Sequence, residues 1–319
     1  MAGLDANRCQ RTLKNTMNTW NQVTTMPSVL GESPFWHPQE QMLYWADIAG
    51  CKVHRLNPFM GDVHTWEMPS EPGCFAPAKS GGFIIALRDR IVRAQAWNGE
   101  LTLLAMIDHD ANTTRSNDGK CDAAGRFWVG TMFEPRTSPS AKLYCWDGQT
   151  LQLKQGNAVV ANALAFSPDS KTIYWADTPH HTIWAWDFDS ASGEMKHQRV
   201  FKQFAAKPQG WVSGMPSNGG YGGRPDGAAV DVQGNLWVAM FEGKRVVQLS
   251  SSGQELQSIE APITTCTMPA FGGDDMQTLY LTSARHNRSE EEILHEPQMG
   301  CVFSMRVRVA GMPVNFYLN

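Results

Sequence analysis

Four oxygen-bearing side chains share one position relative to short aromatic segments, and they are the best candidates for chemistry in this chain. They are Glu32, Asn117, Asn162 and Asp226. The aromatic segments that follow begin at Leu43, Phe127, Ile173 and Leu236, so the offsets are 11, 10, 11 and 10 residues. Residues that hold one position in repeated units converge when the units are arranged around an axis. Converging carboxylates and carboxamides indicate a cation site.

The chemistry of this set follows from its two carboxylates and two amides. Such hard oxygen donors suit Ca²⁺, Mg²⁺ or Mn²⁺, and carboxylates also bind Zn²⁺. Three protein ligands leave coordination positions open for water and substrate, as in a catalytic metal site. An alternative exists for Asp118 and Asp226, because aspartates in N-D-G and P-D-G commonly cap turns. Capping is the stronger interpretation of either aspartate alone, whereas the shared register favours a site.

Arg115 lies two residues before Asn117 and is a candidate for binding substrate oxygens through its forked donors. A surface salt bridge accounts equally well for an arginine at this place. The nine histidines show no HxH or HExxH spacing, and the chain has neither a GxSxG elbow nor a P-loop. The oxygen-bearing set is therefore the best-supported site.

The elements that must position these side chains are strands of a six-fold repeat. The segments GFIIAL from Gly82 and LYLTSA from Leu279 complete a set of six, with spacings of 39, 45, 46, 63 and 43 residues. Apart from the fourth, these spacings match the length of one propeller blade. We therefore predict an all-β fold, a six-bladed β-propeller with four-stranded antiparallel blades. Because the first strand of each blade lines the central channel, the candidates are expected at its mouth.

One domain is predicted over residues 19–319, preceded by an N-terminal tail over 1–18 that is expected to be mobile. The last unit is expected to end with CVFSMRVRVAG and a further strand-like stretch near VNFYL. The segment WNQVTTMP near the N-terminus is expected to pair into that blade, so that N- and C-terminal strands close the ring and leave few free edges. Helix is expected only as a turn or two near EEEILHEP.

The spacing of 63 residues locates an insertion over 205–224, roughly 20 residues beyond the usual blade length. It is rich in Gly, Pro and Ser, and it ends beside Asp226. Long loops in compact folds are often lids or binding loops. We expect this loop to face the substrate, and an idle surface loop is the alternative.

Composition argues against several classes of partner. The 319 residues carry a net charge of −4, from 27 Lys and Arg against 31 Asp and Glu, without a basic patch, so no nucleic acid is expected. No segment approaches the roughly 18 apolar residues of a membrane span, and the N-terminus lacks an apolar secretion signal. Seven scattered cysteines without a CxxC pair predict reduced thiols in a cytoplasmic protein. A monomer or small homo-oligomer is expected.

Five segments resemble the family of SMP-30, gluconolactonase and luciferin-regenerating-enzyme-like proteins, six-bladed propellers that include sugar lactonases. The segments are GESPFWHP at 31–38, RSNDGKCDAAGRFWVGTM at 115–132, ANALAFSPDSKTIYWADT at 161–178, RPDGAAVDVQGNLWVAMFEGKRV at 224–246 and FGG…LYLTSAR ending at Arg285. They occur in the family's order and cover most of residues 30–310.

The resemblance implies a role for each candidate. Glu32, Asn162 and Asp226 would hold one divalent cation, and Asp226 would also act as the general acid and base. Arg115 and Asn117 would contact the hydroxyls and the lactone of the substrate.

Two departures from the family pattern concern the same site. Ala163 follows Asn162 where the family often has glycine, so that a methyl group is expected to narrow the pocket or alter the local backbone. Some members carry a substrate-contacting Glu where this chain has Pro135. Glu134, one residue earlier, is retained as a candidate substrate contact.

The leading hypothesis is metal-dependent hydrolysis of a sugar lactone to the aldonic acid in carbohydrate catabolism. Asp226 would take a proton from the attacking water and return it to the leaving ring oxygen. One alternative keeps the site but changes the substrate to an aryl ester or organophosphate. Another is a non-catalytic binding propeller, suggested by Trp-Asp pairs at 146–147 and 186–187, although the Gly-His partner of WD repeats is missing.

Overall fold

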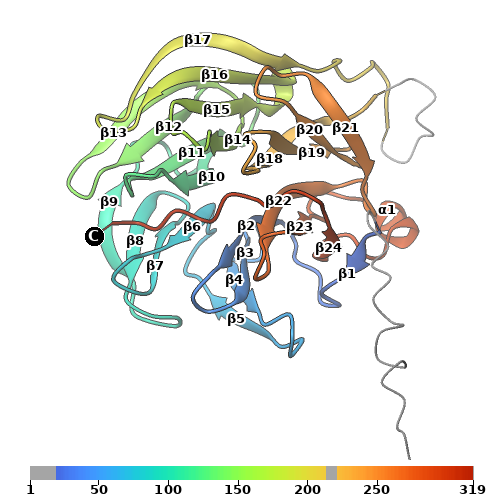
Figure 1. Cartoon of the computed structure of the whole chain (residues 1–319), viewed down its shortest axis with the longest axis horizontal. Coiled ribbons are helices and arrows are strands. Elements are labelled where there is room, and N and C mark those ends of the chain that lie inside the picture. The colour runs from blue at the N-terminus through green and yellow to red at the C-terminus, as the bar shows by residue number, and fades with distance from the viewer. Residues whose placement is uncertain (1–18, 213–220, 319) are drawn as a thin grey trace, which may run out of the picture.

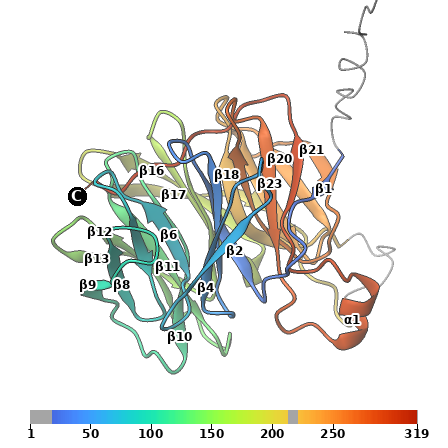
Figure 2. The same cartoon turned by 90° about the horizontal axis from the view of Figure 1, so that it is seen from below.

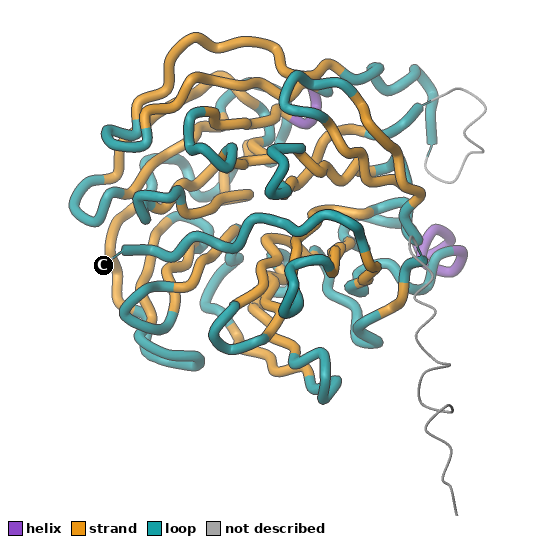
Figure 3. Tube along the Cα trace, viewed as in Figure 1, coloured by secondary structure: helices purple, strands orange, loops and turns teal. Residues whose placement is uncertain are grey.

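The computed structural model describes residues 19–212 and 221–318, which form six sheets arranged around a central axis (Figure 1). Each sheet has four antiparallel strands. Strands make up most of the trace, and helix is confined to two short segments of the described residues (Figure 3). The predicted six-bladed β-propeller is confirmed. The tail expected over 1–18 lies outside the described residues.

The first three blades follow one another along the chain. Blade 1 contains β2 (Gly31–His37), β3 (Met42–Asp47), β4 (Lys52–Leu56) and β5 (Val63–Glu67). Blade 2 contains β6 (Cys74–Pro77), β7 (Phe83–Ala86), β8 (Arg90–Ala94) and β9 (Thr102–Met106). Blade 3 contains β10 (Thr114–Cys121), β11 (Phe127–Phe133), β12 (Ala141–Trp146) and β13 (Leu151–Ala158).

The last three blades include the two helical segments. Blade 4 contains β14 (Ala161–Phe166), β15 (Thr172–Asp177), the 3₁₀ turn η1 (Thr178–His180), β16 (Thr182–Asp189) and β17 (Glu194–Gln203). Blade 5 contains β18 (Arg224–Val230), β19 (Leu236–Phe241), β20 (Arg245–Leu249) and β21 (Glu255–Glu260). Blade 6 contains β22 (Cys266–Gly272), β23 (Thr278–Ser283), β24 (Phe303–Arg306) and β1 (Asn21–Gln22), with α1 (Glu290–His295) between β23 and β24.

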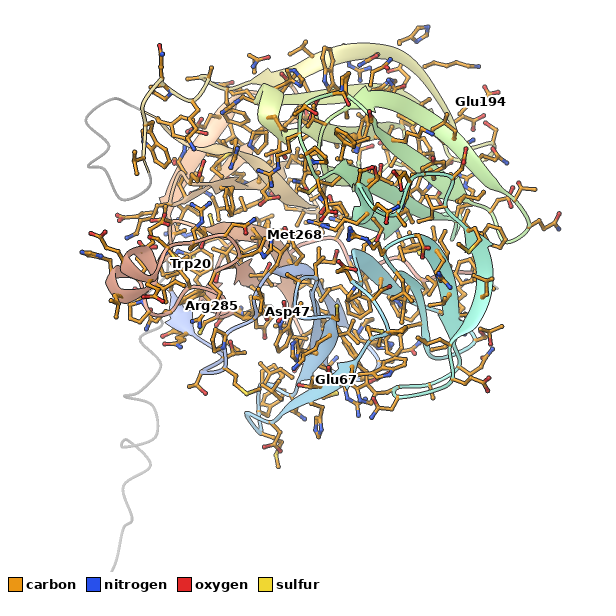
Figure 4. The ribbon with its side chains drawn as sticks, turned by 180° about the vertical axis from the view of Figure 1, so that it is seen from behind. Trp20, Asp47, Glu67, Glu194, Met268 and Arg285 are labelled. Carbon is orange, nitrogen blue, oxygen red and sulfur yellow. The ribbon has the colours of Figure 1, made fainter. Side chains whose placement is uncertain are left out.

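Within each blade the four strands are ordered from the axis outward, with the first strand innermost and the fourth outermost. The first strands, such as β2 and β22, are buried along their whole length, whereas the fourth strands β5, β9, β17 and β21 are mostly exposed or half-buried. Met268, on β22, lies near the middle of the ring, and Glu67 and Glu194, on fourth strands, lie at its periphery (Figure 4). The six aromatic segments of the repeat are the second strands, and their apolar side chains fill the clusters between neighbouring blades.

The ring closes as predicted, through a strand from each end of the chain. Strand β1 pairs with β24, with Asn21 opposite Ser304. The stretch near VNFYL does not extend blade 6, which corrects that expectation. It crosses the ring instead, and Tyr317 pairs with Ala78 beside blade 2. Figure 2 shows this C-terminal segment near one end of the ring and α1 near the other.

Two further expectations are met by the described residues. Helix α1 forms in the EEEILHEP segment, where Ser289 and Glu292 make a capping box. The six cysteines that the structure describes are free thiols. No helix in the described ranges has the length and apolar character to cross a membrane.

Buried aspartates hold two of the turns between first and second strands. Asp231, in the DVQGN turn, accepts hydrogen bonds from two backbone N–H groups of its own turn and from the indole N–H of Trp237 at 2.9 Å. Asp122, in the DAAGR turn, accepts from the indole N–H of Trp128 at 2.8 Å. Because each indole belongs to a second strand, the carboxylate ties the turn to its blade.

Replacing Asp231 by alanine is expected to lower the free energy of unfolding by about 3 kcal/mol or more, because several buried donors lose their acceptor. These donors include Gln248 Nε2, at 3.0 Å. Urea unfolding measures the effect. The matched control is Asp169→Ala in the exposed SPDSK turn, which should cost less than about 1 kcal/mol. Equal losses for the two variants would contradict this account of the turn.

Candidate functional site

All four side chains that share the sequence register lie in one cavity around the axis. The cavity has a volume of about 520 Å³ and is lined by Glu32, Asn117, Asn162 and Asp226, from blades 1, 3, 4 and 5. All four residues are buried, and between 4 and 7% of the surface of each residue is exposed. Arg115 and Glu134 line the same cavity. The structure thus brings together all six residues of the predicted site.

A β-bulge in each of these four first strands aims the side chains. Between first and second strands the pairing register shifts at Glu32/Phe35, Ser116/Gly119, Asn162/Ala165 and Pro225/Ala228. At each shift two residues of the first strand oppose one of the second, which bends the strand and redirects its side chains. Glu32 and Asn162 are the last paired residues before the bulge, whereas Asn117 and Asp226 lie within it. The offsets have another origin: each candidate stands 4 residues before the partner of its segment's first residue, and that pair is 7 residues apart in blades 1 and 4 but 6 apart in blades 3 and 5.

Ala163 lies within the bulge of β14 and has a left-handed backbone, with φ of 49°. Its methyl group is fully buried in the hydrophobic cluster that contains Ala165, Tyr174 and Ala228. It does not line the cavity. The expectation that this methyl group narrows the pocket is therefore wrong. The departure from glycine concerns the local backbone, where an alanine holds a left-handed conformation that glycine adopts more readily.

A directional chain of hydrogen bonds fixes both site amides. The Thr178 hydroxyl donates to the carbonyl of Pro225 at 2.7 Å, so it must accept from Asn162 Nδ2 at 2.8 Å. Asn162 Oδ1 is thereby set as an acceptor, and Asn117 Nδ2 donates to it at 2.8 Å. Asn117 Oδ1 in turn accepts from Arg115 Nη1 at 2.7 Å. The amide oxygens therefore have one orientation before any ligand arrives.

Glu32 and Asp226 are buried carboxyl groups with little internal compensation. Burial raises the pKa of Asp226 to about 8, against the opposing charge of Arg224. Burial also raises the pKa of Glu32 well above its usual range, and the nearby charge of Asp226 adds to this rise. Glu32 accepts one backbone hydrogen bond, from Ser33 at 3.3 Å. Over the described ranges Asp226 has no ion pair or side-chain hydrogen bond, so the ionised pair requires positive charge from elsewhere.

The turn-capping alternative is not what the structure shows for these aspartates. The Asp226 carboxylate faces the cavity without capping any described backbone group. Asp118 accepts a hydrogen bond at 2.8 Å from the backbone N–H of Leu164, in the neighbouring blade. Asp118 thus links two blades beneath the site.

The donor set fits a divalent cation. Two buried carboxyl groups form no ion pair with any described residue, their pKa values stay raised although arginines lie nearby, and the oxygen of Asn162 is held in an accepting orientation beside them. Hard oxygen donors of this kind suit Ca²⁺, Mg²⁺ or Mn²⁺ and also accept Zn²⁺. No three His, Cys, Asp or Glu side chains gather as a metal site in the described parts of the chain, since the third donor here is an amide.

Several polar residues that line the cavity were not anticipated from the sequence. They are Glu71, Arg136, Arg224, His286, Asn287 and Arg288. A signal for Arg224 was present, because it stands two residues before Asp226, as Arg115 stands two residues before Asn117. Within the described part of the 205–224 loop, only Arg224 lines the cavity, so the expected substrate-facing role stays a prediction for that loop.

Glu134 lies between two arginines at the rim of the cavity. It forms an ion pair with Arg88, and its Oε1 is 3.7 Å from Arg115 Nε. Arg88 also pairs with Glu71 at 2.7 Å. The charges of this wall therefore compensate one another, and Glu134 helps to hold Arg115 in place.

Comparison with known proteins gives consistent matches over the whole propeller. A family model described as the SMP-30/Gluconolactonase/LRE-like region matches residues 30–285. A 6-deoxy-6-sulfogluconolactonase from Pseudomonas putida is 44% identical over 291 residues, covering 91% of this chain and 95% of the relative. Regucalcin from Gallus gallus is 32% identical over 295 residues, and the match covers 89% of this chain and 93% of regucalcin. A solved structure of regucalcin, a calcium-binding protein from Agrobacterium tumefaciens, has a TM-score of 0.85 at 26% identity, covering 94% of this chain and 97% of that one.

The raised pKa of Asp226 predicts how stability depends on pH in the absence of divalent cations. The folded protein keeps this proton up to about pH 8, whereas the unfolded chain loses it near its ordinary pKa of 3.8. The stabilisation is therefore complete below about pH 4 and is lost as the pH rises towards about 8. In EDTA, the melting temperature of the wild type should fall by several degrees relative to Asp226→Asn between about pH 5 and pH 8. A difference that stays constant over this range would contradict the assignment.

Proposed function

Since the chain belongs to the SMP-30/gluconolactonase/LRE-like family, we propose that it hydrolyses a sugar lactone to the corresponding aldonic acid. The observation that carries this proposal is the convergence of Glu32, Asn162 and Asp226 with Arg115 and Asn117 in one cavity of about 520 Å³. The volume suits a small ligand. The 44% identical relative from Pseudomonas putida is a 6-deoxy-6-sulfogluconolactonase, which supports a lactone as the substrate class.

Asp226 is the proposed general base and acid. It faces the cavity with no described hydrogen-bond partner, so its carboxylate is available to a water molecule beside the substrate. As the water oxygen bonds to the lactone carbonyl carbon, its proton passes to Asp226. When the ring carbon–oxygen bond breaks, the same proton passes to the leaving ring oxygen and completes the hydroxyl group. Water and lactone are consumed, one carboxylic acid is formed, and Asp226 returns to its starting state.

Arg115 and Asn117 are proposed to orient the substrate. The guanidinium of Arg115 is fixed by Asn117 Oδ1 at 2.7 Å, the Ser116 carbonyl at 2.9 Å and Met132 Sδ at 3.2 Å. Both amide hydrogens of Asn117 are already committed, to the carbonyl of Ala161 and to Asn162. Asn117 can therefore meet a substrate hydroxyl only as an acceptor. Glu134 is placed to support Arg115 rather than to act alone.

A divalent cation is proposed to be held by Glu32, Asn162 and Asp226. When bound, such an ion, whether Ca²⁺, Zn²⁺, Mg²⁺ or Mn²⁺, supplies Lewis-acid chemistry next to Asp226 and Arg115. The calcium-binding regucalcin from Agrobacterium tumefaciens supports this proposal, as does the burial of two carboxyl groups that form no ion pair with the described residues.

Replacing Asp226 by asparagine is expected to lower kcat on gluconolactone by about 10²- to 10⁴-fold, because the side chain no longer accepts and returns a proton. Acid release in a weakly buffered indicator assay measures the rate, and circular dichroism checks that the variant is folded. Asp169→Asn, in an exposed turn, serves as the matched control and should retain the wild-type rate. An Asp226→Asn enzyme with more than about a tenth of the wild-type kcat would rule out this role.

Removal of divalent cations is expected to abolish lactone hydrolysis reversibly. The protein is dialysed against EDTA, its metal content is measured, and activity on aldonolactones and aryl esters is assayed before and after adding back each of Ca²⁺, Zn²⁺, Mg²⁺ and Mn²⁺. Full activity in protein verified to be free of metal would contradict cation dependence. Aryl ester hydrolysis without lactone hydrolysis would favour the esterase alternative.

A further inference from the structure

The cavity has two poles of opposite charge. The buried carboxylates Glu32 and Asp226 form the acidic pole. Three arginines line another part of the cavity, namely Arg136, Arg224 and Arg288. These arginines come from three blades: Arg136 from the β11–β12 connection, Arg224 from the start of β18, and Arg288 from the segment between β23 and α1. Because Arg136 is exposed and the carboxylates are buried, the basic pole reaches the rim of the cavity.

Two of the three arginines contact a common pair of residues. The guanidinium carbons of Arg224 and Arg288 lie 5.3 and 5.7 Å from the centre of the same Phe241 ring. Both arginines also approach Glu242, at 3.3 and 3.6 Å. Desolvation by the surrounding wall, and then the charge of Arg224, lower the pKa of the Arg136 guanidinium, as expected for neighbouring cations. The three side chains therefore form one basic wall.

Positive charge on this wall exceeds the negative charge available to it. Arg224, Arg288 and Lys207 share Glu242, and Arg288 also contacts Glu292 at 3.3 Å. Across the described residues Arg136 has no ion pair and no side-chain hydrogen bond. Four cations thus share two carboxylates by direct contact, and the buried Asp226 is the further carboxyl whose charge acts on Arg136 and Arg224. By contrast, Arg88 and Arg115 are balanced by Glu71 and Glu134.

Most of the hydrogen-bond donors of the basic wall are also unused. A guanidinium has five N–H donors. Over residues 19–212 and 221–318, the side chains of Arg136 and Arg224 make no hydrogen bond, and the Nε atoms of Arg224 and Arg288 are buried without a partner, so the terminal nitrogens are the donors open to a ligand. Planar guanidinium groups with free donors match the oxygens of phosphate-like and carboxylate groups, with several hydrogen bonds to one anion. A neutral sugar hydroxyl would bring no negative charge to these three arginines.

We propose that the basic wall of Arg136, Arg224 and Arg288 is a subsite for an anionic substituent of the sugar lactone, a sulfonate or a phosphate, placed away from the lactone group. The inference rests on the proposed function, because the lactone must lie at Asp226 for the substituent to reach the arginines. A hexonolactone with a charged group on its terminal carbon has the required polarity, with the reacting end at the acidic pole and the anion at the basic wall.

The test compares three substrates that differ only at the terminal carbon: gluconolactone, 6-phosphogluconolactone and 6-deoxy-6-sulfogluconolactone. The wild type should turn over at least one anionic lactone with a kcat/KM about 10- to 100-fold above that for gluconolactone, mainly through KM, as expected for one or two charge-assisted hydrogen bonds. The better of the two anions identifies the group that the wall is built for. Equal kcat/KM values for all three lactones would overturn the subsite.

Arg136→Ala is the most informative variant because this side chain holds no other described residue in place. It should reduce kcat/KM for the preferred anionic lactone about tenfold or more and change that for gluconolactone less than about twofold. Arg136→Lys should recover part of the loss, and Arg288→Gln should act in the same direction as Arg136→Ala. Arg308→Ala, at an exposed arginine outside the cavity, is the matched control and should change neither value. A loss of the same size on the neutral lactone would contradict an anion subsite.

Failure of the subsite is distinguishable from failure of the proposed function. If gluconolactone is hydrolysed but the anionic lactones gain nothing, the subsite is wrong and the lactonase proposal stands. If no lactone is hydrolysed, calorimetric titration with 6-deoxy-6-sulfogluconate still tests the wall. Binding that Arg136→Ala weakens about tenfold would support the subsite, and binding that the variant leaves unchanged would overturn it.

Discussion

The β-bulge in the first strand of a blade is the constraint on which the site depends. Strand side chains alternate between two faces, so a regular first strand would turn adjacent residues in opposite directions. Two residues opposing one at Glu32/Phe35, Asn162/Ala165 and the corresponding places in β10 and β18 break this alternation. Side chains from four blades then meet in one volume, although their offsets from the second strands differ by one residue. The strained backbone at Ala163 belongs to the bulge of β14.

The surrounding propeller keeps apart charges that would otherwise pair. Among the described residues Glu32 and Asp226 form no ion pair although several arginines line the same cavity, and Arg224 and Arg288 pair with Glu242 instead. Arg115 is held by Asn117 and Met132, and Arg224 by Glu242 and the ring of Phe241. Such preorganised polarity costs folding free energy, which the clusters between the blades offset. This separation of charge suits a ligand that carries polar or charged groups at both of its ends.

Much of the architecture could be predicted from the sequence because the repeat is expressed in local patterns. The second strands are apolar and aromatic, and their spacing gave the blade count. The closing strand pair was predictable for a different reason, because a ring that stayed open would leave an unpaired strand edge. The path of the C-terminal stretch was not, because residues near Tyr317 look strand-like and yet pair with Ala78 far along the chain. The register located Glu32, Asn162 and Asp226, whereas Arg136 and Arg288 come from irregular connections whose direction no periodic pattern encodes. Their roles, like those of the register residues, remain proposals.

The closure of blade 6 also has a consequence for how the protein is made. Its outermost strand, β1, is synthesised before every other described strand of the propeller, and its partner β24 is synthesised after all of them. During synthesis the early blades must wait as an open arc with unpaired edges, and Asn21 has no partner until Ser304 emerges. Loop closure over almost the whole chain is entropically costly, and long-range strand pairing is slow. The growing chain therefore carries unpaired strand edges, which favour aggregation, until β24 emerges and allows the ring to close.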